Sequence, residues 1–184
     1  MTMIKIQPIT TASAHYPFVE ALLHSAFPPE ERRDTDRQRA NTDAGGRFRC
    51  NLLTDDEGGE ARPVGLLTCW NFDTFVYIEH FAIDPNLRGG GYGSRALEAL
   101  KALLPSTPIL LEVEEPTDET ACRRIAFYRR QGFTLHEVDY LQPPYREGDG
   151  WLPLKLMSAG GLDVESCFDD IRHRLYTHVY GVRP

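Results

Sequence analysis

The stretch Ile78-Glu-His-Phe-Ala-Ile-Asp-Pro-Asn-Leu-Arg88-Gly-Gly-Gly91-Tyr-Gly93-Ser-Arg-Ala-Leu-Glu-Ala-Leu100 decides the fold. Residues Phe75 to Ile83 are rich in aromatic and β-branched side chains, which favours a strand, and Asp84-Pro-Asn86 has the chemistry of a turn. From Ser94 onward apolar residues recur at steps of three and four, which indicates an amphipathic helix up to Leu104. The stretch therefore predicts a strand, a turn and a helix in that order.

The turn between strand and helix is basic and dense in glycine. Four of the seven residues from Arg88 to Ser94 are glycine, so the backbone can approach a ligand closely. The N–H groups and the dipole at a helix start attract anions, which predicts a phosphate site. Two known phosphate loops fit poorly: a nucleotide P-loop requires a lysine that is absent here, and the Rossmann glycine pattern is met only loosely. A glycine-rich turn without a ligand is the remaining alternative.

The spacing Arg88-x-x-Gly91-x-Gly93, after a strand and at the start of a helix, resembles the acetyl-CoA-binding motif of the GNAT superfamily of N-acetyltransferases. Ala126-Phe-Tyr128-Arg-Arg-Gln-Gly132-Phe133 resembles the helix that runs past the coenzyme in that superfamily. The two motifs cover roughly Ile78 to Phe133. The resemblance implies an α/β fold of GNAT type, an acyl-CoA N-acyltransferase with a mixed, mostly antiparallel, splayed sheet flanked by helices.

The resemblance also implies a set of coenzyme contacts, with acetyl-CoA as co-substrate and no metal. The backbone of one strand would bind the pantetheine arm and the glycine turn would hold the diphosphate. The residues are Phe81, Ala82 and Ile83 on the strand, and Arg88, Gly89, Gly90, Gly91, Tyr92, Gly93 and Ser94 on the turn.

Transfer of an acetyl group to an amine needs a group that takes the amine's proton and a group that gives a proton to the departing thiolate. Tyr128 is the candidate acid because it lies four residues before Gly132 and matches the family's acid position. The alternative for Tyr128 is a half-buried core tyrosine, because aromatic residues on a helix stripe are usually core. Tyr140 and Tyr145 are weaker candidates, expected at the rim of the site.

Two glutamates are candidates for the base. Glu112 alternates with Leu111 and Val113 in a predicted strand, and some members of the family place a catalytic glutamate at the matching point. Glu79 is a carboxylate inside an apolar run, where it is costly unless it is paired or functional. The alternative for both is a strand residue held in a salt bridge, for instance with Arg123 or Arg124.

The composition fits one soluble domain over residues 1–184, with 41% hydrophobic and 26% charged residues. A net charge of −7 argues against nucleic acid or an anionic membrane as the main partner and weakly favours a cationic amine acceptor. The N-terminus lacks a secretory signal, so a cytoplasmic location is expected. Four scattered cysteines without Cys-x-x-Cys spacing predict buried free thiols rather than a zinc site or disulfides.

The rest of the chain predicts an edge strand over Ile4–Ile9, a helix over Ala14–Phe27, a hairpin of Arg47–Thr54 and Pro63–Phe72, and closing strands over Phe133–Leu141 and Trp151–Met157. Residues 29–41 are dominated by charge and are expected to be an exposed connection or a solvated helix. The resemblance to the GNAT superfamily implies the functional alternative, a wall of the acceptor site. A stripe of five apolar residues predicts a helical extension over residues 162–181, capped at Asp163. This extension would pack back on the domain or form a dimer contact, so the chain is expected to be a monomer or a homodimer.

The sequence thus predicts an N-acetyltransferase that moves the acetyl group of acetyl-CoA to a primary amine by direct attack. A non-catalytic module that binds or senses acyl-CoA remains the alternative, since fold resemblance alone does not establish catalysis.

Overall fold

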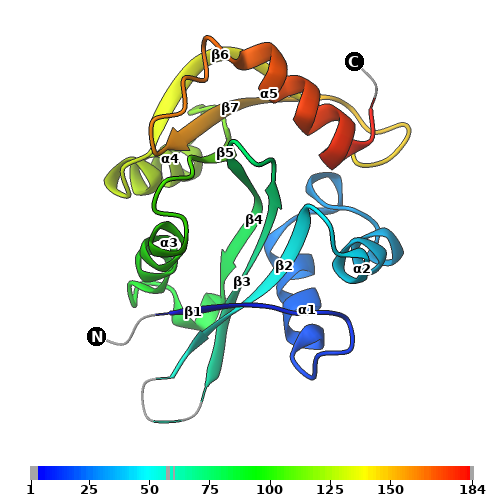
Figure 1. The fold of residues 1–184 in the computed structure, drawn as a ribbon, viewed down its shortest axis with the longest axis vertical. Helices are drawn as coiled ribbons and strands as arrows, with labels where there is room; N and C mark the ends of the chain where they lie inside the picture. Colours follow the sequence, from blue (N-terminus) through cyan, green and yellow to red (C-terminus); the bar gives the residue numbers. More distant parts are fainter. Residues whose placement is uncertain (1–3, 57–58, 60, 183–184) are drawn as a thin grey trace. The chain divides into compact units, whose positions relative to one another are not determined.

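A computed structural model describes residues 4–56, 59 and 61–182 (Figure 1). Contacts within the chain divide it into two compact units. The first comprises Met1–Trp70 and Ile78–Pro105, and the second comprises Asn71–Tyr77 and Ser106–Pro184. Strand β4 (Val76–Ile83) has residues in both units.

The first unit contains three antiparallel strands, and β4 continues their order. β1 pairs with β2 from Lys5↔Thr54, and β2 pairs with β3 from Phe48↔Trp70. Figure 1 shows α3 on one side of these strands, with α1 and α2 on the other. The elements are β1 (Lys5–Pro8), α1 (Tyr16–Ala26), the 3₁₀ turn η1 (Pro29–Glu31), α2 (Thr35–Ala44), β2 (Phe48–Asp55), β3 (Arg62–Asn71), the 3₁₀ turn η2 (Pro85–Leu87) and α3 (Tyr92–Leu103). The predicted edge strand, first helix and hairpin strands are confirmed; part of the predicted hairpin loop, residues 57–58, lies outside the described residues.

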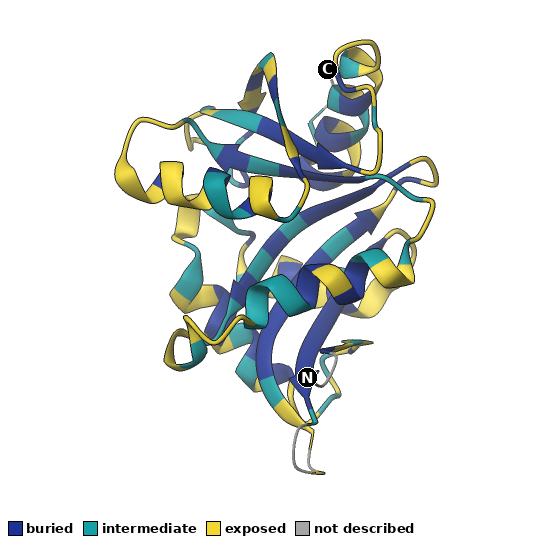
Figure 2. Cartoon of the chain, turned by 90° about the vertical axis from the view of Figure 1, so that its left-hand side faces the viewer, coloured by how far each residue is buried: buried dark blue, intermediate teal, exposed yellow. Residues whose placement is uncertain are grey.

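The core of this unit is formed by the strands and the inner face of α3. Leu53, Leu66 and Leu67 are fully buried, and so are Ala96 and Leu97 on α3. Figure 2 shows the buried residues running along the strands, while exposed residues line the outer faces of the helices. One position of the predicted α3 stripe is wrong, because Leu103 lies in the last turn and is 63% exposed.

Gly65 allows a close approach between β3 and β4. A Cβ atom at this position would lie 2.4 Å from the carbonyl oxygen of Ala82, which is backbone and cannot turn aside. Gly65→Ala is therefore expected to lower the free energy of unfolding by about 1–3 kcal/mol, measured by urea denaturation. Gly150→Ala is the matched control, since a Cβ there meets no atom within 4 Å. Equal stability of the two variants would contradict this reading of β3 and β4.

The second unit is a sheet with helices on its two sides (Figure 1). β5 and β6 both pair antiparallel with β7, and the Val76 N–H at the start of β4 donates to the Pro108 carbonyl oxygen (2.9 Å). The elements are β5 (Ile109–Glu114), α4 (Glu119–Arg130), β6 (Thr134–Gln142), β7 (Leu152–Ala159), α5 (Phe168–Arg174) and a π-helix, η3 (Leu175–Tyr180). Because β4 has residues in both units, the strands form one mostly antiparallel sheet of seven strands. Their order is β1-β2-β3-β4-β5-β7-β6.

The C-terminal segment, residues 163–182, packs back on its own unit. The Tyr176 hydroxyl donates to the Leu141 carbonyl oxygen (2.6 Å), and Arg174 Nη1 donates to that of Phe72 (3.2 Å). The predicted start of its helix is wrong: Asp163 Oδ1 accepts from the Ser166 N–H (3.1 Å) and closes a turn, and the helix begins at Phe168. The Asp163 bond is that of an N-cap, and the Cys167 N–H donates to the Asp163 carbonyl oxygen (3.1 Å), so a single turn forms at Asp163 before the regular helix.

The charged segment after α1 is less exposed than its composition suggests. A helix is confirmed as α2, but Arg33, Gln38 and Thr42 are buried, with exposed fractions of 2%, 3% and 7%. The expectation of an exposed connection over residues 29–41 is therefore wrong at Arg33 and Gln38, and Thr42 lies directly after that segment. Arg33 has an ion pair with Glu79 and the Thr42 hydroxyl donates to the Gln38 carbonyl oxygen (2.8 Å), whereas Oε1 of Gln38 is buried without a hydrogen-bond partner among the described residues.

Candidate functional site

The glycine turn in the first unit has the strand-to-helix geometry that the sequence predicts. Asp84 ends β4 by accepting from the Asn86 N–H (2.9 Å). Gly89 and Gly91 then adopt left-handed backbone angles, with φ of +82° and +74°. Gly91 is the N-cap residue of α3, so the helix starts at Tyr92, two residues earlier than expected. The first-turn N–H groups of a helix point out of its N-terminal end, which here is the glycine turn.

The side of the turn at Gly89 and Gly91 is open. A Cβ atom on either glycine would meet no atom within 4 Å, whereas one on Gly90 would lie 2.9 Å from the ring of Tyr92. Arg88 and the three glycines are exposed. The turn can therefore accept a ligand directly against its backbone, as a bound diphosphate requires.

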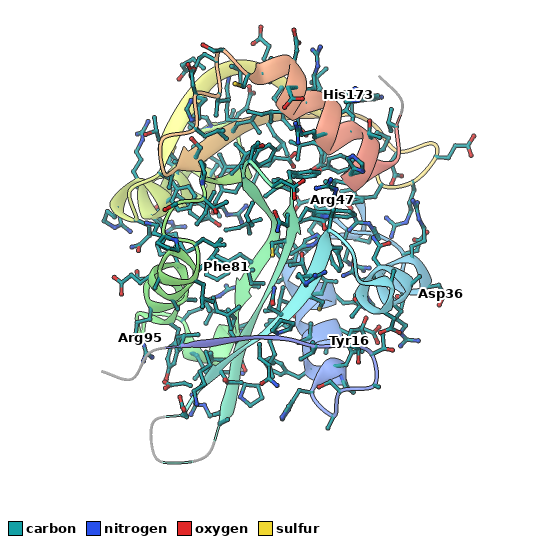
Figure 3. All side chains as sticks on the ribbon, in the orientation of Figure 1. Tyr16, Asp36, Arg47, Phe81, Arg95 and His173 are labelled. Atoms are coloured by element: carbon teal, nitrogen blue, oxygen red, sulfur yellow. The ribbon has the colours of Figure 1, made fainter. Side chains whose placement is uncertain are left out.

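Arg95 fixes the first turn of α3, and the sequence analysis did not find it. Its Nη2 lies 3.2 Å from Oδ2 of Asp55 at the end of β2, and its guanidinium lies 4.4 Å from the Tyr92 ring centroid. Asp55 has a side chain only 4% exposed, so the ion pair is shielded from water. Figure 3 labels Arg95 on α3 and Phe81 on β4, two of the side chains on the elements that flank the turn. The signal for this role in the sequence was a basic residue, Arg95, in the first turn of the predicted helix.

The strand that precedes the turn carries the predicted pantetheine contacts. Ala82 is buried, with an exposed fraction of 8%, and Phe81 and Ile83 are half-buried. The predicted coenzyme residues, 81–83 and 88–94, thus all belong to the first unit. Glu79 lies in this unit as well, whereas Glu112 and Tyr128 lie in the second.

Glu79 is a buried carboxylate with both oxygens engaged. Oε1 lies 2.5 Å from Nη1 of Arg33, and Oε2 accepts from Trp70 Nε1 (2.9 Å). The Glu79 and Arg33 side chains are 0% and 2% exposed, and the Arg33 guanidinium lies 5.3 Å from the centroid of the Trp70 ring. The partner is therefore Arg33 rather than Arg123 or Arg124, whose ion pairs are with Glu119 and Glu114.

The neighbouring residue His80 is held on both ring nitrogens. Nε2 donates to the carbonyl oxygen of Glu31 (2.9 Å), and Nδ1 lies 3.0 Å from the Thr68 hydroxyl. Burial lowers the pKa of His80, so the ring stays neutral and structural at neutral pH. Residues 31–33 are thereby attached to β4 at two consecutive positions, 79 and 80.

Glu112 in the second unit lies among tyrosines. Its Oε1 accepts from the Tyr140 hydroxyl (2.5 Å) and its Oε2 from the Tyr180 hydroxyl (2.8 Å). The Tyr180 hydroxyl lies 3.2 Å from that of Tyr77, and the Tyr145 ring lies 5.0 Å from the Tyr180 ring, centroid to centroid. The expected rim position of Tyr140 and Tyr145 is wrong, since they are 2% and 5% exposed. The C-terminal segment covers this face, which the sequence could not reveal.

Tyr128 lies on α4, and local interactions define both ends of this helix. Asp118 caps the helix by accepting from the Ala121 N–H (2.8 Å), and Gly132 adopts φ of +78° beyond its end. Tyr128 is 8% exposed, and burial raises its pKa to about 12, so it keeps its proton at neutral pH. Within the described part of the chain its hydroxyl has no hydrogen-bond partner, unlike the Tyr180 hydroxyl. A buried phenol with an unused donor can give a proton to a substrate.

His136 joins β6 to the C-terminal segment. Its Nδ1 lies 2.8 Å from Oε1 of Glu165, and its Nε2 lies 2.8 Å from Oγ of Ser158 on β7. The bond with His136 holds the pKa of the Glu165 carboxyl below its usual range. The order acid, histidine, serine is that of serine hydrolases, but Ser158 is 4% exposed between β5 and β6, where a substrate has no access. The two contacts of the His136 ring therefore attach Glu165 of the C-terminal segment to the sheet.

The cysteines differ in part from the prediction. All four are free thiols, and Cys50 is buried, but Cys122 and Cys167 are exposed. In residues 4–56, 59 and 61–182, no three His, Cys, Asp or Glu side chains are gathered as metal ligands. None of the helices in the described part of the chain has the length and hydropathy needed to cross a bilayer.

Comparison with known proteins gives consistent matches. The sequence model of the acetyltransferase (GNAT) family matches residues 16–133. The "Putative acetyltransferase YjbC" of Bacillus subtilis (strain 168) is 32% identical over 114 residues, which are 60% of this chain and 54% of that protein. The chain thus spans about half the length of this curated relative.

Solved structures extend the match to nearly the whole chain. The "Putative acetyltransferase from GNAT family from Bacteroides thetaiotaomicron" is 53% identical, with a TM-score of 0.92 over 97% of this chain and 99% of that one. Arabidopsis thaliana Naa50, in complex with the bisubstrate analogue CoA-Ac-MVNAL, is 18% identical, with a TM-score of 0.58 over 85% of this chain and 97% of that one. At 18% identity this structural similarity is evidence for a shared fold alone.

Proposed function

The chain belongs to the acetyltransferase (GNAT) family, and from that premise we propose that it transfers the acetyl group of acetyl-CoA to a primary amine by direct attack. The observation that carries the proposal is the glycine turn. Left-handed Gly89 and Gly91 open a helix, and the space beside them is free of protein atoms. Such a turn binds a diphosphate through backbone N–H groups.

The coenzyme contacts follow from this turn. Residues 88–94 would hold the diphosphate, with the Arg88 guanidinium adding a full charge to the backbone donors. Backbone groups of Phe81, Ala82 and Ile83 would bind the pantetheine arm. The ion pair of Arg95 with Asp55 supports this role, because it fixes the helix start before any ligand arrives.

The proton transfers are assigned to Glu112 and Tyr128. The amine nitrogen attacks the thioester carbonyl carbon, the C–N bond forms and the C–S bond breaks. Glu112 takes the proton lost by the amine, directly or through a hydroxyl or water, and Tyr128 gives its proton to the thiolate. Glu79 is the weaker candidate for the base, because its carboxylate is held by the buried Arg33 guanidinium.

Acetyl-CoA is expected to raise the melting temperature of the protein, and Gly91→Val to abolish that shift, because a branched side chain disfavours φ of +74° and fills the open side of the turn. The measurement is thermal unfolding with and without acetyl-CoA. Gly46→Val is the matched control: Gly46 also has positive φ and open space, in the loop before β2. This control should lose stability yet keep the shift. A parent protein without a shift would rule out the assignment.

Turnover is tested separately, by release of free thiol from acetyl-CoA across a panel of small amines and basic peptides. Release with one class of amine supports the transferase. Coenzyme binding without release on any amine would instead favour a non-catalytic acyl-CoA-binding module.

A further inference from the structure

Glu112 receives hydroxyl donors from parts of the chain that are far apart in sequence. Tyr140 lies on β6, Tyr180 ends the π-helix η3, and Tyr77 on β4 extends the chain of hydroxyls behind Tyr180. Each carboxylate oxygen thus accepts from a different phenol. Two donors on two oxygens fix both the position and the rotation of a carboxylate, which a single donor does not.

The helix that carries Tyr180 is fixed at several points. Tyr176, one turn earlier, donates its hydroxyl to the Leu141 carbonyl oxygen, and Arg174 donates to that of Phe72. Gly181 is left-handed, with φ of +71°, and the Val182 N–H returns to the Tyr176 carbonyl oxygen (2.8 Å). The π-helix changes the direction of the last side chains relative to a regular α-helix. π-Helical turns are rare in proteins, and those that occur often lie at functional sites.

The two phenols act as donors at every ordinary pH. The pKa values of Tyr140 and Tyr180 are raised well above the usual range, first by burial and then by the Glu112 charge. Neighbouring phenols act in the same direction. Tyr145 and Tyr176 raise the pKa of Tyr140 further, and Tyr145 and Tyr77 raise that of Tyr180. A phenol that keeps its proton beside a carboxylate donates to it, and this bond favours the ionised form of the carboxylate.

We propose that Tyr180 is a positioning residue for Glu112, and that this residue therefore serves catalysis although it lies outside the residues that the family model matches. The inference rests on the proposed function of Glu112 as the base. Tyr180 holds the carboxylate so that its orientation and its proton affinity suit proton transfer, and Tyr140 shares this task.

The test compares Tyr180→Phe with Tyr176→Phe. Both variants keep the ring and remove one hydroxyl from the same helix, but only the first hydroxyl binds Glu112. Tyr180→Phe is expected to lower kcat about 10- to 100-fold, to leave the KM for acetyl-CoA unchanged, and to move the acidic limb of the pH–rate profile upward. Tyr176→Phe should keep the wild-type pH profile. In a Glu112→Gln background, Tyr180→Phe should add no further loss.

A second measurement does not require turnover. Carbon-13 NMR of glutamate carboxyl groups, with the Glu112 signal assigned by its loss in Glu112→Gln, should show the titration midpoint rising by about one unit in Tyr180→Phe and not in Tyr176→Phe. Equal midpoints in the two variants overturn the proposal. If Glu112→Gln keeps full turnover, the base assignment falls and the inference with it. If Glu112→Gln is inactive and Tyr180→Phe has the wild-type profile, the inference fails alone.

Discussion

Tyr128→Phe is expected to lower kcat about 10²-fold or more while acetyl-CoA still raises the melting temperature by the wild-type amount. The variant removes one oxygen and keeps the ring, which packs against Phe127 and Phe133. Loss of a positioned general acid typically lowers a rate by about 10²–10⁴. Binding of the coenzyme should persist, because residues 81–83 and 88–94 are intact.

The control for this variant is Tyr16→Phe. Tyr16 is also buried, with an exposed fraction of 5%, and burial likewise raises its pKa to about 12. Its hydroxyl lies on α1, so its removal should leave kcat unchanged. The assay is thiol release at saturating acetyl-CoA and amine. Wild-type kcat in Tyr128→Phe would mean that water, rather than this phenol, protonates the thiolate.

Arg33→Met is expected to lower the free energy of unfolding by about 3–5 kcal/mol, because it leaves the buried Glu79 carboxylate without its cation. Urea denaturation measures the loss. The Arg33→Met/Glu79→Gln double variant should recover much of it, since glutamine is uncharged and can still accept from the Trp70 N–H.

Arg39→Met provides the matched control. Arg39 binds Glu20 through two short contacts, 2.7 and 2.8 Å, but its side chain is 50% exposed. Exposed pairs are screened by solvent and contribute little to stability, so this variant should be nearly as stable as the parent. A similar loss for Arg33→Met and Arg39→Met would show that Glu79 is stabilised by something other than the guanidinium.

The sequence predicted best what depends on neighbouring residues. The glycine turn is determined by a few consecutive residues, and it is observed. The Asp118 cap and the left-handed Gly132 at the ends of α4 are likewise local features. The spacing of the C-terminal stripe correctly indicated a buried face, with Ile171 and Leu175 in the core. Its regular helix begins at Phe168, later than expected, after the single turn that Asp163 caps.

The sequence could not predict contacts between distant residues. Arg33 is one of many charged residues in its segment, and nothing local distinguishes it as the partner of Glu79, 46 positions away. The same holds for Glu112 and Tyr180, which are 68 positions apart. Tyr145 lies in an aromatic, proline-rich connection and Tyr140 directly before it, and such a connection is usually exposed. In the structure both are buried, and their rings lie next to those of Tyr180 and Tyr176 from the distant C-terminal segment.

The position of Tyr180 beyond residue 133 has a consequence for how a mechanism can be inferred from relatives. A family match that ends at residue 133 covers the turn proposed to hold the coenzyme, but it stops before Tyr140, Tyr145 and Tyr180. Proteins that share this match can therefore share the turn and differ in the hydroxyls around the residue that corresponds to Glu112. A catalytic base borrowed from such a relative has support only where the relative also carries hydroxyls in place of those of Tyr140 and Tyr180.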